Sequence, residues 1–124
     1  MVCDRCIPDD AETAWRTRGD LTATATVCRE PHFAVALVAC SACGQSFASV
    51  FSERIDWRDG NDPQSTLLIP VSAVEARAVE SAGDDVERVL HRLGARRHLD
   101  AYFGAGPKHD VTWSEATPRF MPHH

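Results

Sequence analysis

The residues best suited to chemistry are four cysteines arranged in two CxxC pairs. Cys3 and Cys6 form the first pair, and Cys40 and Cys43 form the second. Each pair puts two thiols on one tight turn, so the two turns together can offer four sulfurs to one ion. Four thiolates match the tetrahedral, all-sulfur site that zinc prefers in structural roles. The spacing therefore predicts one structural Zn²⁺ in a closed site that has no position for a substrate.

Three other interpretations of these cysteines stay open. The thiols could be small buried side chains with one disulfide among them. A rubredoxin-like iron centre for electron transfer uses the same four thiolates, although its turns usually carry Pro and Gly at both pairs, and here Gly44 follows only the second. A thioredoxin-type redox pair needs its CxxC at a helix N-terminus, whereas both pairs are expected beside loops and strands.

Length, charge and composition bound the class of protein. A chain of 124 residues is expected to form a single domain, residues 1–124, with a core of its own. Its longest apolar run, Phe33 to Ala39, is far shorter than the roughly 20 residues of a membrane span. With no signal-like N-terminus, we expect a cytoplasmic protein without membrane contact, in which the five cysteines stay reduced. A formal net charge of −5 disfavours nucleic acid as a partner.

The first half of the chain carries the patterns of β-strands. From Leu21 to Cys28, apolar and polar residues alternate strictly, which predicts a half-buried strand with Cys28 on its polar face. Phe33 to Cys40 is almost continuously apolar and predicts a central strand that leads into the second cysteine pair. We expect a third strand within residues 46–57 and a short fourth strand at residues 66–69.

The second half carries the patterns of helices. Ser72 and Glu75 fit a capping box, which predicts the start of a helix. An amphipathic stripe predicts a second helix over residues 84–93. Further helical turns are expected at residues 99–103, and from residue 108 onward we expect irregular structure.

The β half resembles a known family. A CxxC turn, a hairpin, a second CxxC followed by Gly, and a strand that begins with an aromatic residue are similar to zinc-ribbon proteins. The stretch CSACGQSF at residues 40–47 matches best, because Gly44 permits a left-handed turn after the second cysteine. At the first pair, Ile7 stands where the second has Gly. The resemblance covers about residues 1–57, and the helical half matches no family that we can name.

Pattern and resemblance together predict an α+β fold, a zinc-ribbon-like antiparallel sheet of three to four strands followed by two to three packed helices. Within the single domain, residues 1–57 form the β part, residues 72–104 the helical part and residues 108–124 an irregular tail. Zinc ribbons often serve as docking or nucleic-acid-contact modules. The acidic charge of this chain favours a protein-binding adaptor or regulator, with a nucleic-acid-contact module or an iron electron-transfer protein as the alternatives.

Other groups of polar residues have ordinary explanations beside a functional one. Cys28 and His32 have metal-ligand spacing, but the sequence favours a free thiol at Cys28 and a turn residue at His32 over a pair of ligands. Four carboxylates lie within residues 53–62, a stretch rich in turn formers. Their spacing does not fit a calcium loop and favours a solvated turn. These are Glu53, Asp56, Asp59 and Asp62.

A basic strip is the remaining candidate for partner contact. Arg88, Arg92 and Arg96 recur every four residues and could face an anionic partner, or they could form a solvated helix face. Trp57 is a further candidate for core or partner contact. No phosphate loop, nucleophile elbow or His-Glu-x-x-His motif occurs in the sequence. We therefore predict no catalytic residue and expect that the chain is not an enzyme.

Overall fold

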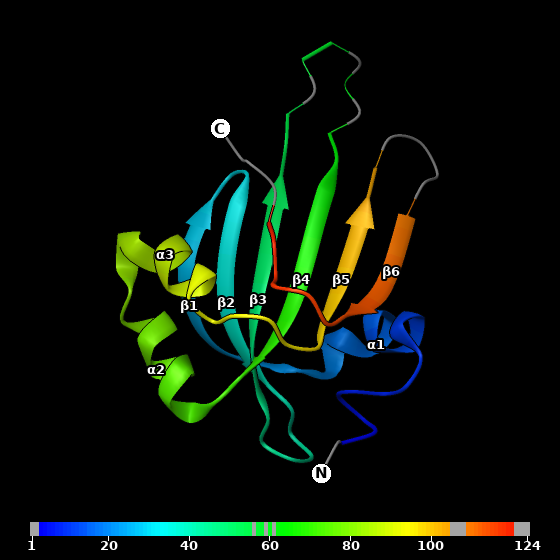
Figure 1. Cartoon of the computed structure of the whole chain (residues 1–124), viewed down its shortest axis with the longest axis vertical. Coiled ribbons are helices and arrows are strands. Elements are labelled where there is room, and N and C mark those ends of the chain that lie inside the picture. Colours follow the sequence, from blue (N-terminus) through cyan, green and yellow to red (C-terminus); the bar gives the residue numbers. More distant parts are fainter. Residues whose placement is uncertain (1–2, 56, 59, 61, 105–108, 121–124) are drawn as a thin grey trace.

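The chain folds around one antiparallel sheet, in which each strand pairs with its neighbours in sequence (Figure 1). The computed structural model describes residues 3–55, 57–58, 60, 62–104 and 109–120. Over these residues the sheet has six strands in the order β1 to β6. The strands are β1 (Thr22–Glu30), β2 (Phe33–Ala39), β3 (Ser46–Glu53), β4 (Gln64–Val71), β5 (His98–Phe103) and β6 (His109–Ser114). The prediction of three to four strands followed by two to three packed helices is therefore wrong.

The largest departure from prediction lies in β5 and β6. Residues 99–103 were expected to be helical but belong to β5, and part of the expected irregular tail forms β6. The apolar spacing at Leu99 and Phe103 fits a helix turn as well as a strand, because so short a window cannot separate the two periods. Pairing with β4, in which Leu99 lies opposite Leu68, satisfies the backbone as a strand. The expected helical part, residues 72–104, is thus only partly helical.

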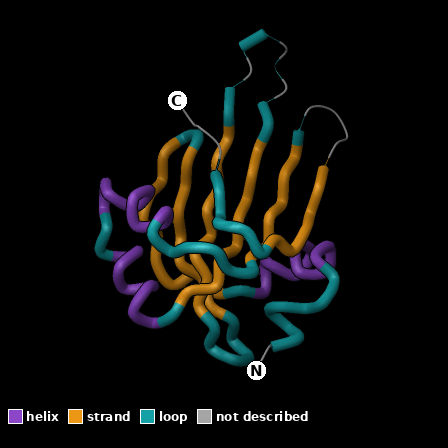
Figure 2. Tube along the Cα trace, in the orientation of Figure 1, coloured by secondary structure: helices purple, strands orange, loops and turns teal. Residues whose placement is uncertain are grey.

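Three short α-helices pack on the sheet, α2 and α3 on one face and α1 on the other (Figure 2). They are α1 (Ala11–Thr17), α2 (Ala73–Glu80) and α3 (Val86–His91), with 3-10 turns η1 (Arg18–Asp20) and η2 (Gly83–Asp85). Asp10 caps α1 by accepting the N–H of Thr13, and the predicted capping box of Ser72 and Glu75 at α2 is confirmed. Among the described residues, no helix is long and apolar enough to cross a membrane.

Irregularities in β1 change which side chains face the core. The register with β2 shifts between Ala23 and Ala25 and again between Thr26 and Cys28. Each extra residue in a bulge reverses the face of the residues that follow it. Cys28 therefore lies opposite Val35 and packs against the core beside Val27, not on a polar threonine face as the strict alternation predicted.

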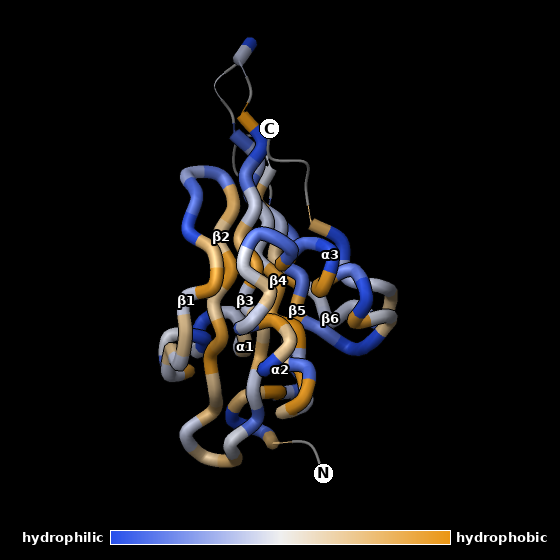
Figure 3. Tube along the Cα trace, turned by 90° about the vertical axis from the view of Figure 1, so that its left-hand side faces the viewer, coloured by the Kyte–Doolittle hydropathy of each residue, from blue (hydrophilic) through white to orange (hydrophobic). Residues whose placement is uncertain are grey.

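Apolar side chains cover both faces of the sheet. Successive residues of β4 show this, because Leu67 and Ile69 belong to one cluster of buried residues and Leu68 to another. The first core, which includes Leu67 and Ile69, packs under α2 and α3 and contains much of β2, coloured as hydrophobic in Figure 3. The second core, which includes Leu68, packs under α1 next to β5 and β6. Helix α1 thereby places the N-terminal segment beside the turn between β2 and β3.

Candidate metal centre

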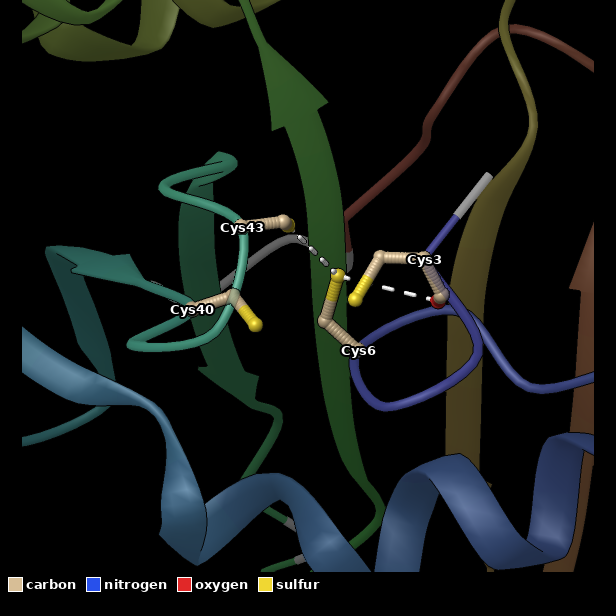
Figure 4. Close-up of side chains that lie close together, drawn as sticks. All are labelled: Cys3, Cys6, Cys40 and Cys43. Carbon is tan, nitrogen blue, oxygen red and sulfur yellow. Dashed lines mark hydrogen bonds between the residues drawn. The ribbon is translucent and has the colours of Figure 1, made fainter. Parts of the chain in front are cut away.

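Two segments far apart in the sequence bring the four cysteines together at one end of the sheet. Cys3 and Cys6 lie on the turn that precedes α1, and Cys40 and Cys43 lie on the turn between β2 and β3 (Figure 4). One sulfur from each of the four residues lies within 4.8 Å of all the others. The two CxxC pairs therefore meet, as their spacing predicts, and they form a cluster that could hold a metal ion.

The separation of the sulfurs fits a tetrahedral site. A metal about 2.3 Å from each of four sulfurs at tetrahedral angles separates those sulfurs by about 3.8 Å. The Sγ atoms of Cys6 and Cys43 lie 3.7 Å apart. An S–S bond is only about 2.0 Å long, and all five cysteines are free thiols. The sulfurs are therefore too far apart for a disulfide, and their separation is compatible with a set of metal ligands.

Both turns are closed by the same backbone hydrogen bond. The carbonyl of Cys3 accepts the N–H of Ile7 at 2.8 Å, and the carbonyl of Cys40 accepts the N–H of Gly44 at 2.8 Å. Gly44 has a φ of +80°, a conformation that glycine adopts without steric cost. Ile7 needs no such conformation, since no described residue other than glycine has a positive φ, and its side chain packs against the second core. The two turns therefore differ in how they end but agree in how they present sulfur.

Backbone hydrogen bonds favour the thiolate form of the first cysteine in each pair. Backbone N–H groups of Cys6 and Arg5 hold the pKa of Cys3 at about 7, below its ordinary value of 9.0. For Cys40, burial raises the thiol pKa, but the N–H groups of Cys43 and Ala42 outweigh burial and leave the pKa lowered. Turn amides thus stabilise negative charge on these two sulfurs, as in other metal-thiolate sites.

The second cysteine of each pair tends to keep its proton. Desolvation, followed by hydrogen bonds to Cys43 and Cys3, raises the pKa of Cys6. At Cys43 the N–H of Gln45 lowers the pKa, but desolvation and the thiol of Cys3 outweigh it and raise the pKa. Four thiolates this close repel one another, so an ion that neutralises them must displace these protons on binding.

Exposure of the cluster is graded from one side to the other. Cys40 is buried, Cys3 and Cys6 are half-buried, and Cys43 is exposed. Four sulfurs complete a tetrahedral shell, so the chemistry of the donor set favours a closed site over a catalytic one. The donor set fits both zinc and iron.

Cys28 and His32 do not join this cluster or each other. Nδ1 of His32 lies 2.9 Å from Oε1 of Glu53, which also accepts a hydrogen bond from Gln64 at its other oxygen. Cys28 points its sulfur toward the carbonyl of Phe33 at 3.9 Å, and burial raises its pKa. Glu53 is therefore part of a pairing between strands, whereas Asp56 and Asp59 lie outside the described residues.

The candidates for partner contact lie on separate elements. Helix α3 ends at His91, so Arg88 is on the helix, Arg92 caps its C-terminus and Arg96 lies beyond it. Arg88 and Arg92 are exposed, and Trp57 is 91% exposed between β3 and β4. A role of these residues in partner contact stays a prediction.

Arg96 is committed to an internal ion pair that the sequence did not reveal. Its guanidinium donates to both carboxylate oxygens of Glu75 at 2.7 Å, to the carbonyl of Pro70 at 3.0 Å and to the carbonyl of Leu93. It thereby fixes the start of α2 to the segment before β5. The sequence did not reveal this ion pair, because the four-residue spacing from Arg92 to Arg96 predicted that both lie on one helix face.

Comparison with known proteins adds no family to these observations. No protein-family model matches the sequence, and no curated protein or solved structure matches it significantly. The resemblance to zinc ribbons therefore rests on the four clustered cysteines and their turns alone.

Proposed function

We propose that the chain binds one Zn²⁺ through Cys3, Cys6, Cys40 and Cys43, and that the ion has a structural role. The observation that carries this proposal is the convergence of the four sulfurs within 4.8 Å from two turns that are distant in sequence. Zinc joins such turns without redox chemistry, and its binding free energy adds directly to the stability of the fold.

The N-terminal arm, residues 3–10, is the part of the chain that such an ion would hold in place. The arm belongs to none of the described strands or helices. Ile7 packs on the second core, and the carbonyl of Pro8 accepts the indole N–H of Trp113 at 2.9 Å. A zinc ion would cross-link the arm to the turn between β2 and β3. Because the four ligands are assembled only in the folded chain, its binding free energy would stabilise the folded state.

Metal analysis tests the proposal directly. Protein purified without added metal is analysed for elements, and a visible spectrum is recorded on the same sample. One zinc per chain and no colour are expected. Iron with a thiolate absorption band would make the chain an electron-transfer protein, and absence of metal with five reactive thiols would refute the centre.

A matched pair of variants separates ligation from general cysteine chemistry. Cys43→Ser removes an exposed ligand, so weaker zinc retention and a lower Tm are expected. Cys28→Ser changes a thiol outside the cluster, and it should keep one zinc per chain. Equal zinc retention in both variants would contradict the assignment of the ligands.

The biological task that we propose is protein binding. Support comes from the net charge of −5, which opposes phosphate contact, and from Trp57, whose side chain is 91% exposed. Tryptophan is enriched among the residues that dominate binding energy at protein interfaces. Trp57→Ala should lose a co-purifying, cross-linkable protein that the control Val74→Ala retains, because Val74 is an exposed apolar residue on α2. Equal recovery with both variants would exclude Trp57 as the contact.

A further inference from the structure

A cavity of about 270 Å³ lies directly against the cysteine cluster. Cys6 and Cys40 form part of its wall, and α1 contributes Ala14. Its volume equals that of about nine water molecules at ~30 Å³ each. The space therefore suits an organic molecule on the order of ten non-hydrogen atoms.

One part of the cavity wall is apolar and belongs to the sheet. Phe47, Leu68 and Leu99 line it from three adjacent strands, and each is at most 7% exposed. Trp113 of β6 also lines the cavity, while its indole N–H is already used by the carbonyl of Pro8. Rigid apolar surface of this kind binds the body of a small ligand, and a few charged groups then set its specificity.

The charged groups around the cavity sum to a negative value when zinc is bound. Asp4 and Asp20 line the cavity and carry one negative charge each. A zinc ion with four thiolates adds two more negative charges. Against these stand the positive charges of Arg5 and Arg18, which leaves a formal charge of about −2.

Arg18 contributes less to the cavity than its formal charge suggests. Its guanidinium lies 3.4 Å from the centre of the Trp15 ring and donates to the carbonyl of Trp15 at 2.5 Å. Trp15 is not among the described residues that line the cavity. The guanidinium of Arg18 is therefore held against the Trp15 ring, whereas no hydrogen bond or ion pair of the described residues neutralises Asp4 or Asp20.

We propose that this cavity binds a small organic cation, a primary amine on a flat apolar body, with its body on the sheet and its ammonium group toward Asp4, Asp20 and the thiolates. This inference rests on the proposed zinc centre, because zinc fixes both turns that form the wall and supplies half of the negative charge. A ligand of this class would occupy a site that is separate from the metal, since it needs no coordination position.

Three probes of similar shape and different charge test the proposal on the zinc-loaded full chain. They are 2-phenylethylamine, 2-phenylethanol and phenylacetate, and the readout is the NMR signal of the Trp113 indole N–H during titration. The amine should bind at least threefold more tightly than the alcohol, and phenylacetate more weakly than the alcohol. Equal affinities, tightest binding of phenylacetate or no shift with any probe would overturn the proposal.

Charge variants tie the binding to the cavity. Asp20→Asn should weaken amine binding about threefold to fivefold, as for a partly solvated charge pair, and leave the alcohol unaffected. Glu80→Gln is the control, because it removes the same charge from an exposed position on α2, which packs on the opposite face of the sheet. It should change the affinity for neither the amine nor the alcohol. Equal weakening in both variants would show a general charge effect and refute the cavity.

Zinc content measured on the titrated sample separates this inference from the proposed function. A sample with one zinc per chain but no preference for the amine overturns the cavity proposal alone. A sample without zinc overturns the metal centre, and the cavity proposal fails with it because the charge that it invokes is missing.

Discussion

The ion pair between Glu75 and Arg96 yields a sharp prediction about stability. Glu75→Gln removes the charge of the carboxylate but keeps a side-chain oxygen that can accept the N–H of Ser72, so the capping box is retained. What the variant loses is the negative charge and the hydrogen bond of 2.7 Å from Nη2 of Arg96 to Oε2, because an amide nitrogen cannot accept it. The bond from Nη1 to the retained oxygen is no longer charge-assisted on the acceptor side. The change therefore isolates the electrostatic link between α2 and the segment before β5.

The magnitude follows from the pKa of Glu75. Hydrogen bonds from Arg96 hold that pKa at about 2, against 4.5 for an unperturbed glutamate. At about 1.4 kcal/mol per pKa unit, the difference corresponds to about 3 kcal/mol. The side chains of Arg96 and Glu75 are 25% and 31% exposed, respectively. Because solvent screens such a pair, we expect about half of this value, ~1.5 kcal/mol, as the loss of unfolding free energy at neutral pH.

The sign of the pH dependence provides a second check. Since folding lowers the pKa of Glu75, its stabilisation is complete above the unfolded value near 4.5 and is lost as the pH falls toward 2. The gap between wild type and Glu75→Gln should therefore be constant from pH 8 to pH 6 and shrink below pH 4.5. Acid also releases thiolate-bound metal, but it does so in both proteins, so the gap between them reports Glu75.

Urea unfolding followed by circular dichroism measures this gap, with Glu80→Gln as a control on the same helix. The control residue is exposed and should shift the unfolding free energy by less than about 0.5 kcal/mol. Raising the salt concentration to 1 M should reduce the effect of Glu75→Gln. A loss below about 0.3 kcal/mol, or a gap that widens in acid, would refute the assignment of this pair as a stabilising link.

Two further predictions concern the metal turns. Gly44→Ala should lower the unfolding free energy by roughly 1–2 kcal/mol and weaken zinc retention, because a Cβ is unfavourable in the left-handed backbone conformation. The control Gly19→Ala should be nearly neutral. Neither added Cβ would meet an atom within 4 Å, so equal losses of stability in both variants would contradict a backbone cause. Removing metal with a chelator should let trypsin cleave after the exposed Arg5, because the arm that carries it is no longer held. The far-ultraviolet circular dichroism signal of the strands should persist, because none of the four clustered cysteines lies in a described strand. Collapse of the strand signal would show that zinc organises the whole fold.

Local signals in the sequence were sufficient for the cysteine turns and the first strands. Two CxxC pairs have few arrangements in which all four sulfurs can be used, and Gly44 marks the end of one turn. The apolar run from Phe33 formed β2 as expected, and Ser72 with Glu75 started α2 where the capping box predicted. These features depend on residues that are neighbours in the chain, which is why they could be predicted.

Features that depend on tertiary pairing could not be predicted. Leu99 and Ala101 are buried as strand residues only because β4 and β6 lie on both sides of them. The face of Cys28 depends on register shifts in β1 that leave no mark in an alternating sequence. Arg96 has the spacing of an exposed helix face, yet its partner Glu75 lies 21 residues away. The cavity beside the cysteines likewise arises from segments at opposite ends of the chain.

The pairing of α1 with the last strand has a consequence for synthesis on the ribosome. Both CxxC turns have been made once Cys43 has emerged, so the proposed zinc ion would have its four ligands while most of the sheet is still absent. Helix α1, however, packs on β5 and β6. The carbonyl of Pro8 can accept its hydrogen bond only after Trp113, 105 residues later, has been made. Strands that pair with their sequence neighbours can form as they emerge, but the apolar side of α1 stays uncovered until β5 and β6 have been made. A metal ion bound at this early stage would hold the uncovered apolar side of α1 close to its own sheet and so reduce its contact with other nascent chains.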